Sequence, residues 1–221
     1  MNQKKIFTFL HKVAIHNNRE WFGAHKALYM EAAAEFQSMA ETLIERIGQF
    51  DSEMLSIPVK STLYRFYRDT RFSADKSPYK RHFGTYINPR GKKSLHGGYY
   101  FHLEPGQCMV ALGSYYLEPP VLHAVRNSIL YDTERFLSIA EDAHFRQAFP
   151  NMSLSKLKTI PKGFPRDFAH PEYLKAKDYC IWTNISDEAV MSPNWADTVA
   201  QLFETGKPFL DFINETVDDY I

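Results

Sequence analysis

The chain has 221 residues, of which 44% are hydrophobic and 15% aromatic, and its 26 Lys and Arg balance 26 Asp and Glu. This composition is too apolar for a disordered chain and too varied for a repetitive one, so it predicts a globular protein. No apolar run fits a membrane span or a signal peptide, and we expect a cytoplasmic protein without a membrane partner. Cys108 and Cys180 are too few for a disulfide framework and are expected to be buried free thiols.

The N-terminal part of the chain is predicted to be helical. Apolar residues recur at helical spacing from Ile6 to Ala14, which predicts a first helix. A second apolar stripe, from Phe36 to Ile47, predicts one helix or two in tandem over residues 18–48. Asn17 followed by Glu20 resembles a capping box and is expected to open this stretch.

The hydrophobic period changes to two in the middle of the chain, which predicts strands. Pro105 and Gly106 favour a tight turn between the last two of them. We therefore expect an antiparallel meander of about four to six strands. The alternating stretches are residues 63–67, 82–87, 99–104 and 108–112.

Helices are expected again after the strands. Pro119 and Pro120 are predicted to open one of them, and a strand is expected near Tyr179 to Ile185. Ser192 and Pro193 are expected to begin a helix that Gly206 and Pro208 stop, with a last helix after it. Helices, strands and helices in this order favour an α+β fold in a single domain over 1–221. The expected layout is helical over 1–50, mainly β with an Arg/Lys-rich loop over 58–115, helical over 118–149, mixed over 150–192 and helical over 193–221.

The net charge of zero hides a strong asymmetry. Residues 60–93, the basic segment, hold ten Lys and Arg against two Asp, a balance of +8. Residues 178–221 hold nine Asp and Glu against Lys207 alone, a balance of −8. Either the two segments neutralise each other or form solvated faces, or the basic segment holds an anion.

The basic segment favours an anion site. Arg65, Arg68 and Arg71 follow at three-residue steps where a predicted strand gives way to a loop. Guanidinium groups fit phosphate or carboxylate oxygens two at a time, and Asp69 and Asp75 offset only part of the positive charge. Together with a tyrosine of the next strand pair, the candidate ligand-binding residues are Arg65, Arg68, Arg71, Lys76, Tyr79, Lys80 and Tyr100.

Several stretches resemble the uncharacterised bacterial and fungal family known as domain of unknown function 2461. The central motif is close to the family spelling RIYRDxRFSxDKxPYKxxF, with mild departures at Phe66 and Ala74. The resemblance implies no established reaction, cofactor or catalytic residue. It suggests a signature made of Arg65, Arg68, Asp69, Arg71, Phe72, Ser73, Asp75, Lys76, Pro78, Tyr79 and Lys80. The stretches are NNREWFGAHKALY (17–29), VKSTLYRFYRDTRFSADKSPYKRHFG (59–84), GGYYFHLEPG (97–106), LKTIPKGFPRD (157–167) and KPFLDFIN (207–214).

A second element lies in the strand around His102. Alternation places Tyr100, His102 and Glu104 on one face of a strand. His102 and Glu104 are candidate catalytic residues for general acid or base chemistry, or else His102 bonds a tyrosine and Glu104 pairs with an arginine as scaffold. The nine histidines are scattered without an HExxH helix or a Cys/His ligand set, so no metal site is predicted.

Three functions remain open at this point. The favoured one is a protein that binds a small anionic ligand, a phosphate or a carboxylate, with or without catalysis. The second is a single-stranded nucleic-acid-binding protein, because aromatic residues alternate with cations, although a pI near 7.1 speaks against it. The third is a non-enzymatic interaction scaffold. The sequence leaves the cofactors and the oligomeric state open.

Overall fold

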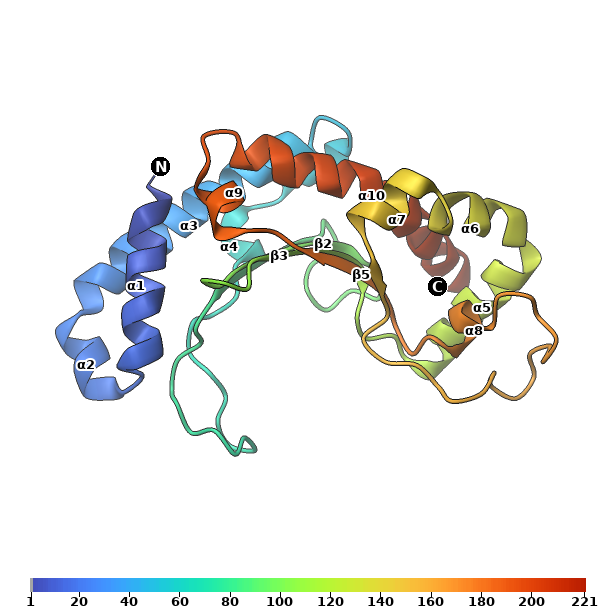
Figure 1. Ribbon diagram of the computed structural model, residues 1–221, viewed down its shortest axis with the longest axis horizontal. Coiled ribbons are helices and arrows are strands. Elements are labelled where there is room, and N and C mark those ends of the chain that lie inside the picture. Colours follow the sequence, from blue (N-terminus) through green and yellow to red (C-terminus); the bar gives the residue numbers. More distant parts are fainter. Residues whose placement is uncertain (1) are drawn as a thin grey trace. The chain divides into compact units, whose positions relative to one another are not determined.

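A computed structural model describes residues 2–221 (Figure 1). It confirms the α+β class: one five-stranded antiparallel sheet, in the order β1-β2-β3-β5-β4, is combined with helices near both ends of the chain. Its five strands lie within the expected range of about four to six. The strands are β1 Phe83–Ile87, β2 Gly98–Leu103, β3 Met109–Ser114, β4 Asn151–Met152 and β5 Tyr179–Asn184.

The helices follow the predicted order. Within residues 2–221, no helix combines the length and the apolar character needed to cross a membrane. The helices are α1 Gln3–Ile15, α2 Arg19–Ala24, α3 Lys26–Ile47, the 3-10 helix η1 Ser52–Ser56, α4 Val59–Thr62, α5 Pro119–Tyr131, α6 Thr133–Ala140, α7 Ala143–Ala148, α8 Pro171–Lys175, α9 Asp187–Met191 and α10 Trp195–Tyr220.

The residues group into two compact units, which are described in turn. The first contains residues 2–91, 100–110 and 184–201, and the second contains residues 92–99, 111–183 and 202–221. The single domain expected over 1–221 stays a prediction.

The first unit has an aromatic core. The ring of Phe66 lies 5.4 Å from that of Phe9 on α1 and 5.0 Å from that of Phe83 on β1. Phe36 of α3 stacks on the same Phe83 ring at 5.2 Å. Rings at these separations add edge and stacking contacts to the free energy of burying apolar surface. This core fixes α1 and α3 against one face of β1.

The helical pair predicted over residues 18–48 is confirmed as α2 and α3, but its cap lies one residue later than expected. The side chain of Asn18 accepts a hydrogen bond from the backbone N–H of Trp21 at 2.9 Å, which makes Asn18 the N-cap of α2. Asn17 is not the cap, because its side-chain amide binds the backbone of Tyr79 instead.

The strand predicted over residues 63–67 is wrong as a full strand. The segment forms isolated antiparallel bridges, Leu63 with Thr85 and Tyr67 with Tyr79. Between the bridges Phe66 turns into the aromatic core, so the segment does not run as a regular pleated strand beside β1. The segment is extended, but it is not one of the five strands of the sheet. We call it the ribbon.

The second unit is built around the C-terminal part of α10. The predicted stop at Gly206 and Pro208 is wrong, because α10 continues through both residues. A Cβ atom on Gly206 would lie 2.9 Å from the methyl groups of Leu112 and 3.1 Å from the Phe149 ring, so the helix packs closely at this glycine. Burial of Phe209 and Ile213 on one face outweighs the hydrogen bond that Pro208 cannot donate.

The expected helix start at Ser192 and Pro193 is also wrong by about two residues, a common size of error for helix ends. Ser192 follows α9 as its C-cap, and α10 begins at Trp195. Its hydroxyl donates to the carbonyl of Ala189 at 2.8 Å, so it closes one helix and does not open the next.

Acidic residues of the last helix pair outside the basic segment. Asp197 binds Arg46 at 2.7 Å in the first unit. In the second unit Glu215 binds Arg135 through both carboxylate oxygens, at 2.6 and 2.8 Å. Part of the acidic charge of residues 178–221 is therefore neutralised by arginines that do not belong to the basic segment.

Candidate functional site

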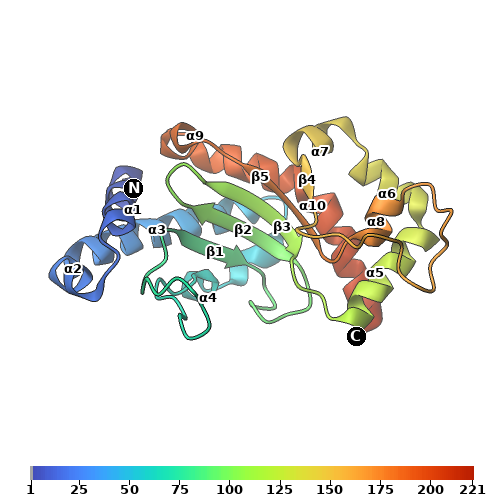
Figure 2. The same cartoon turned by 60° about the horizontal axis from the view of Figure 1, so that its bottom comes forward.

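One face of β1 and β2 carries the polar residues of the site. Along β2, Phe101 and Leu103 are fully buried on the side of the helices, whereas Tyr100 and His102 point the other way with Glu104 just beyond the strand end. This confirms the shared face expected from their spacing. In Figure 2 the side of β1 and β2 that faces away from α3 is turned toward the viewer, and no helix of the first unit lies in front of it. We call it the open face.

His82 joins these residues from the neighbouring strand. It immediately precedes β1, and its ring lies 4.2 Å from that of His102. Its Nδ1 atom is 3.7 Å from Glu104 Oε2, and the Nε2 atom of His102 is 3.1 Å from the same oxygen. The three side chains are 14 to 26% exposed. They form a partly buried set, the histidine cluster, that solvent still reaches.

The protonation of this cluster is set mainly by burial. Burial, followed by His102 and the charge of Lys80, lowers the pKa of His82 from 6.5 to about 3. Burial also lowers the pKa of His102, although the hydrogen bond to Glu104 opposes that shift. Burial raises the pKa of the Tyr100 hydroxyl, with Tyr64 and Glu104 adding to the effect. Both imidazoles are therefore neutral near pH 7, and Tyr100 keeps its proton.

A hydrogen-bonded chain follows from these states. Glu104 can only accept, so the Nε2–H of His102 donates to it, and the Tyr100 hydroxyl donates to His102 Nδ1 at 2.9 Å. Tyr100 fits because Gly84 faces it: a Cβ atom on Gly84 would lie 2.9 Å from the hydroxyl oxygen. The chain Tyr100–His102–Glu104 can pass a proton along the strand face.

Lys80 brings positive charge to the same face. Its ammonium group lies 5.2 Å from the centre of the Tyr64 ring, which in turn meets Tyr100 edge to face at 6.1 Å. The positive charge of Lys80 also contributes to the lowered pKa of both His82 and His102. Of the predicted site residues, the fold thus brings together Lys80, Tyr100, His102 and Glu104.

The arginines lie elsewhere, in a loop over residues 68–78 that we call the arginine loop. Arg68 is largely enclosed by this loop: its Nη1 bonds the carboxylate of Asp75 and both the hydroxyl and the carbonyl of Ser77. Its Nη2 reaches the hydroxyl of Ser73 at 3.3 Å. This guanidinium group holds the loop together from inside.

The remaining loop cations also have local partners or face water. Arg71 binds Asp69 through two hydrogen bonds, at 3.0 and 2.7 Å, and its side chain is 77% exposed. The ammonium group of Lys76 donates to the carbonyl of Thr70 at 3.0 Å. Arg65 is exposed on the ribbon before the loop. Arg68 and Arg71 therefore each face a carboxylate of the loop itself rather than one shared pocket.

Tyr79 serves the core and anchors the loop. It is 5% exposed and stacks on Phe22 of α2, with the ring centres 3.9 Å apart. The side-chain amide of Asn17 donates to the Tyr79 carbonyl at 2.9 Å and accepts from its N–H at 3.1 Å. The predicted ligand-binding role of Tyr79 remains untested, but its ring is packed against α2.

The Asp75 carboxyl gives a direct test of the loop geometry. Hydrogen bonds from the N–H and the hydroxyl of Ser77, and then from Arg68, lower its pKa from 3.8 to about 2. Because the folded-state value is the lower one, these bonds stabilise the loop above pH 3.8 and are lost as the pH falls through about 2. We expect carbon-13 NMR to show Asp75 titrating near pH 2, and Ser77→Ala to move the midpoint upward.

Asp69 is the internal control for that titration, because Arg71 rather than Ser77 lowers its pKa. Its midpoint should stay unchanged in Ser77→Ala. A wild-type midpoint for Asp75 close to 3.8 would contradict the loop geometry.

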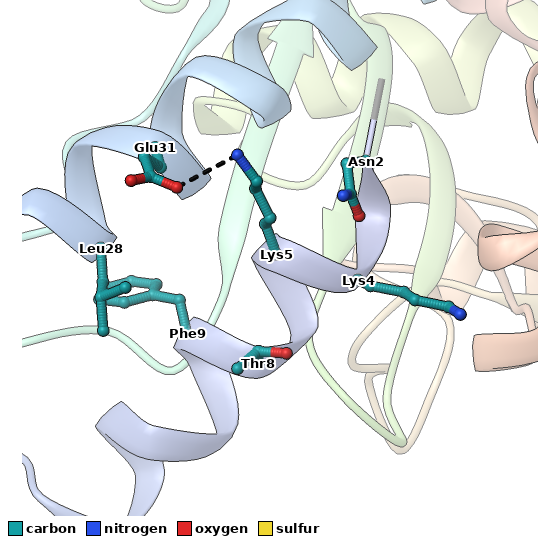
Figure 3. Close-up of a pocket in the computed structure, with 7 residues that line it drawn as sticks. All are labelled: Asn2, Lys4, Lys5, Thr8, Phe9, Leu28 and Glu31. Carbon is teal, nitrogen blue, oxygen red and sulfur yellow. Dashed lines mark ion pairs between the residues drawn. The ribbon is translucent and has the colours of Figure 1, made fainter.

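A separate shallow pocket lies between α1 and α3 (Figure 3). Phe9 and Leu28 form its apolar part, and Lys5 pairs with Glu31 across its edge at 3.1 Å. Its main charges compensate each other, and it contains no residue of the predicted site. The two thiols offer no reactive group either, since burial raises the pKa of both Cys108 and Cys180 to about 12.

His82 is the site residue that the sequence analysis missed. It shares a strand face with Gly84 and Tyr86, two and four residues later, so strand periodicity alone puts these three on one face. Which face of β1 meets which face of β2 depends on the strand register, and the long connection between them hides that register.

These observations define an α+β protein whose antiparallel sheet carries a tyrosine, two histidines, a glutamate and a lysine on its open face. The chain matches the family described as conserved hypothetical protein (DUF2461) over residues 5–212, and it belongs to this family. Neither the comparison with curated proteins nor the comparison with solved structures finds a match.

Proposed function

We propose that this protein binds a small ligand carrying a phosphate or carboxylate group on its open face, next to Lys80. The observation that carries the proposal is the position of Lys80, whose ammonium group lies 5.2 Å from the centre of the Tyr64 ring, which in turn contacts Tyr100. Its positive charge also acts on two partly buried, neutral imidazoles. An ammonium group binds such anions through charge-assisted hydrogen bonds.

Partial burial supports the proposal energetically. His82, His102 and Glu104 are each less than a third exposed, so hydrogen bonds formed here face less competition from water than at the surface. The exposed cations Arg65 and Arg81, which follow Tyr64 and Lys80 in the sequence, add positive charge that attracts an anion from solution. Glu104 opposes an anion, but its carboxylate faces the two imidazoles.

This proposal keeps the anionic ligand expected from the sequence and changes the residues that hold it. The arginines expected to form the pocket face Asp75 and Asp69 instead. The proposal places the ligand in the cytoplasm, as the sequence predicts, and leaves open whether a bond is made or broken.

The test compares two lysines of the basic segment. We expect Lys80→Ala to weaken the binding of inorganic phosphate or citrate roughly tenfold to a hundredfold, the loss of one charge-assisted hydrogen bond, in isothermal titration calorimetry. Lys76→Ala removes the same charge at the loop tip, where the ammonium group donates to Thr70, and should leave the affinity unchanged. Equal losses in both variants, or no saturable binding to the wild type, would refute a site at Lys80.

One observation favours single-stranded nucleic acid as the second candidate. Phe72 is 96% exposed, Tyr67 is 49% exposed, and the guanidinium group of Arg71 lies 5.8 Å from the Phe72 ring centre. Exposed rings beside cations suit base stacking and phosphate contact. Steeply salt-dependent binding of an oligothymidylate, abolished by Phe72→Ala, would favour this function. If the protein binds neither the oligothymidylate nor phosphate or citrate, a non-enzymatic interaction scaffold is the function that remains.

A further inference from the structure

We propose that His82, His102 and Glu104 form a site for a divalent transition-metal ion, with Zn²⁺ as the best-fitting metal. Two imidazoles and one carboxylate are ligands that such ions prefer. The inference goes beyond the anion proposal, because a metal can bind here whether or not an anion does.

The distances between the candidate ligand atoms suit one ion. The Nε2 atom of His102 and the Nδ1 atom of His82 lie 3.1 and 3.7 Å from Glu104 Oε2, and one ligand atom from each residue lies within 4.8 Å of the others. Tetrahedral zinc with bonds of about 2.0 to 2.1 Å separates its ligand atoms by about 3.3 Å. Small side-chain rotations, mainly between the two rings, would complete this geometry.

The backbone holds the three residues in place. His82 directly precedes β1, His102 lies within β2, and Glu104 follows β2 at the turn with Pro105 and Gly106. Each has an adjacent residue whose side chain is buried on the other side of the sheet. Leu103, between His102 and Glu104, is fully buried, and Phe83, next to His82, is 6% exposed in the aromatic core. A site built on packed strands loses little further freedom when an ion binds.

Tyr100 is the group that allows His102 to serve as a ligand. In the metal-free protein the hydroxyl donates to Nδ1 of His102, and Nε2–H donates to Glu104. To bind a metal, His102 must move its proton to Nδ1 and free the lone pair of Nε2. The Tyr100 oxygen can then accept from Nδ1–H, which is the supporting bond that metal-binding histidines usually have.

The site would leave a coordination position open. The cluster lies on the open face, and its side chains stay 14 to 26% exposed, so three protein ligands leave room for water or an anion. The positive charge of Lys80 acts on both imidazoles and opposes a cation, and Glu104 offsets only one charge. A doubly charged anion as the fourth ligand would offset the rest.

A second group of residues with metal-binding side chains serves as a comparison for the histidine cluster. Glu141, His170 and Glu172 also have ligand atoms within 4.8 Å of one another. There the carboxylate of Glu141 is already held by Arg146 at 2.7 Å and by the hydroxyl of Tyr173. A metal would have to displace these partners, so His170 serves as the control position.

The experiment is a Co²⁺ titration of the full-length, untagged protein after treatment with a chelator, in phosphate-free buffer. Co²⁺ replaces Zn²⁺ and gives visible absorption bands that report its ligands. We expect one Co²⁺ to bind per chain with bands of low coordination number, and added Zn²⁺ to displace it. Glu104→Gln and His102→Ala should each weaken binding at least roughly tenfold, and His170→Ala should not.

The outcomes separate this inference from the anion proposal. Lys80→Ala should retain Co²⁺ binding even though it is expected to lose phosphate affinity. Circular dichroism of Glu104→Gln, a substitution of nearly equal volume, checks that lost binding is not lost folding. No visible bands with the wild type, or equal binding by wild type and a folded Glu104→Gln, would overturn the metal site.

Discussion

Gly113→Ala is expected to destabilise the protein by more than about 3 kcal/mol, enough to prevent folding in a protein of ordinary stability. Gly113 has a φ angle of +103°, a conformation that residues with a side chain rarely adopt. An added Cβ atom would also lie 2.1 Å from the carbonyl oxygen of Tyr179 on the neighbouring strand β5. Neither backbone can move without breaking the pairing of β3 with β5. Soluble yield and urea unfolding measure the effect.

Gly163→Ala is the matched control. Gly163 also has a positive φ angle, +94°, but nothing lies within 4 Å of its would-be Cβ atom. The alanine there should cost only the backbone strain, about 1 to 3 kcal/mol. Equal losses in the two variants would mean that the close approach to Tyr179 contributes nothing, and the packing of β3 on β5 would have to be wrong.

Arg68→Ala is expected to open the arginine loop without unfolding the rest of the first unit. Arg68 donates to Asp75, to Ser77 and to Ser73, so the variant removes the shared centre of the loop. Loss of several such hydrogen bonds should speed amide hydrogen exchange in residues 69–77 on the order of tenfold to a hundredfold. Exchange in β1 should change little, because Phe66 and Phe83 keep that strand packed.

Arg71→Ala removes a neighbouring guanidinium group with a different role. Its bond to Asp69 spans two residues at the exposed surface, and such pairs add little to stability. We expect hydrogen exchange in the loop to stay close to that of the wild type. Similar acceleration in both variants would show that total charge, and not the position of Arg68, maintains the loop.

The fold class followed from the sequence because periodicity is a local property. The turn at Pro105 and Gly106, the start of α5 at Pro119 and the strand near Tyr179 all appear in the structure. The errors fall where tertiary packing outweighs local preference. Pro208 lies inside α10 because burial of one helix face outweighs its missing hydrogen bond, and Phe66 leaves strand geometry to join the aromatic core.

The candidate site was only partly predictable for the same reason. The shared face of Tyr100, His102 and Glu104 depends on one strand and was confirmed. The addition of His82 depends on the register between two strands, which no local pattern contains. The basic segment shows the opposite case: its charge is visible in the sequence, but the internal use of Arg68 depends on how the loop folds back on itself.

The pair of hydrogen bonds between the Asn17 side-chain amide and the Tyr79 backbone also bears on the order in which the chain folds. Its two hydrogen bonds join residues 62 positions apart, so this contact requires a long loop to close. Helices α1 and α2, which flank Asn17, can form from local contacts, whereas the segment at Tyr79 reaches its place only after they exist. A nascent chain would therefore shape the N-terminal helices first and add the base of the arginine loop as one of the last steps in this unit.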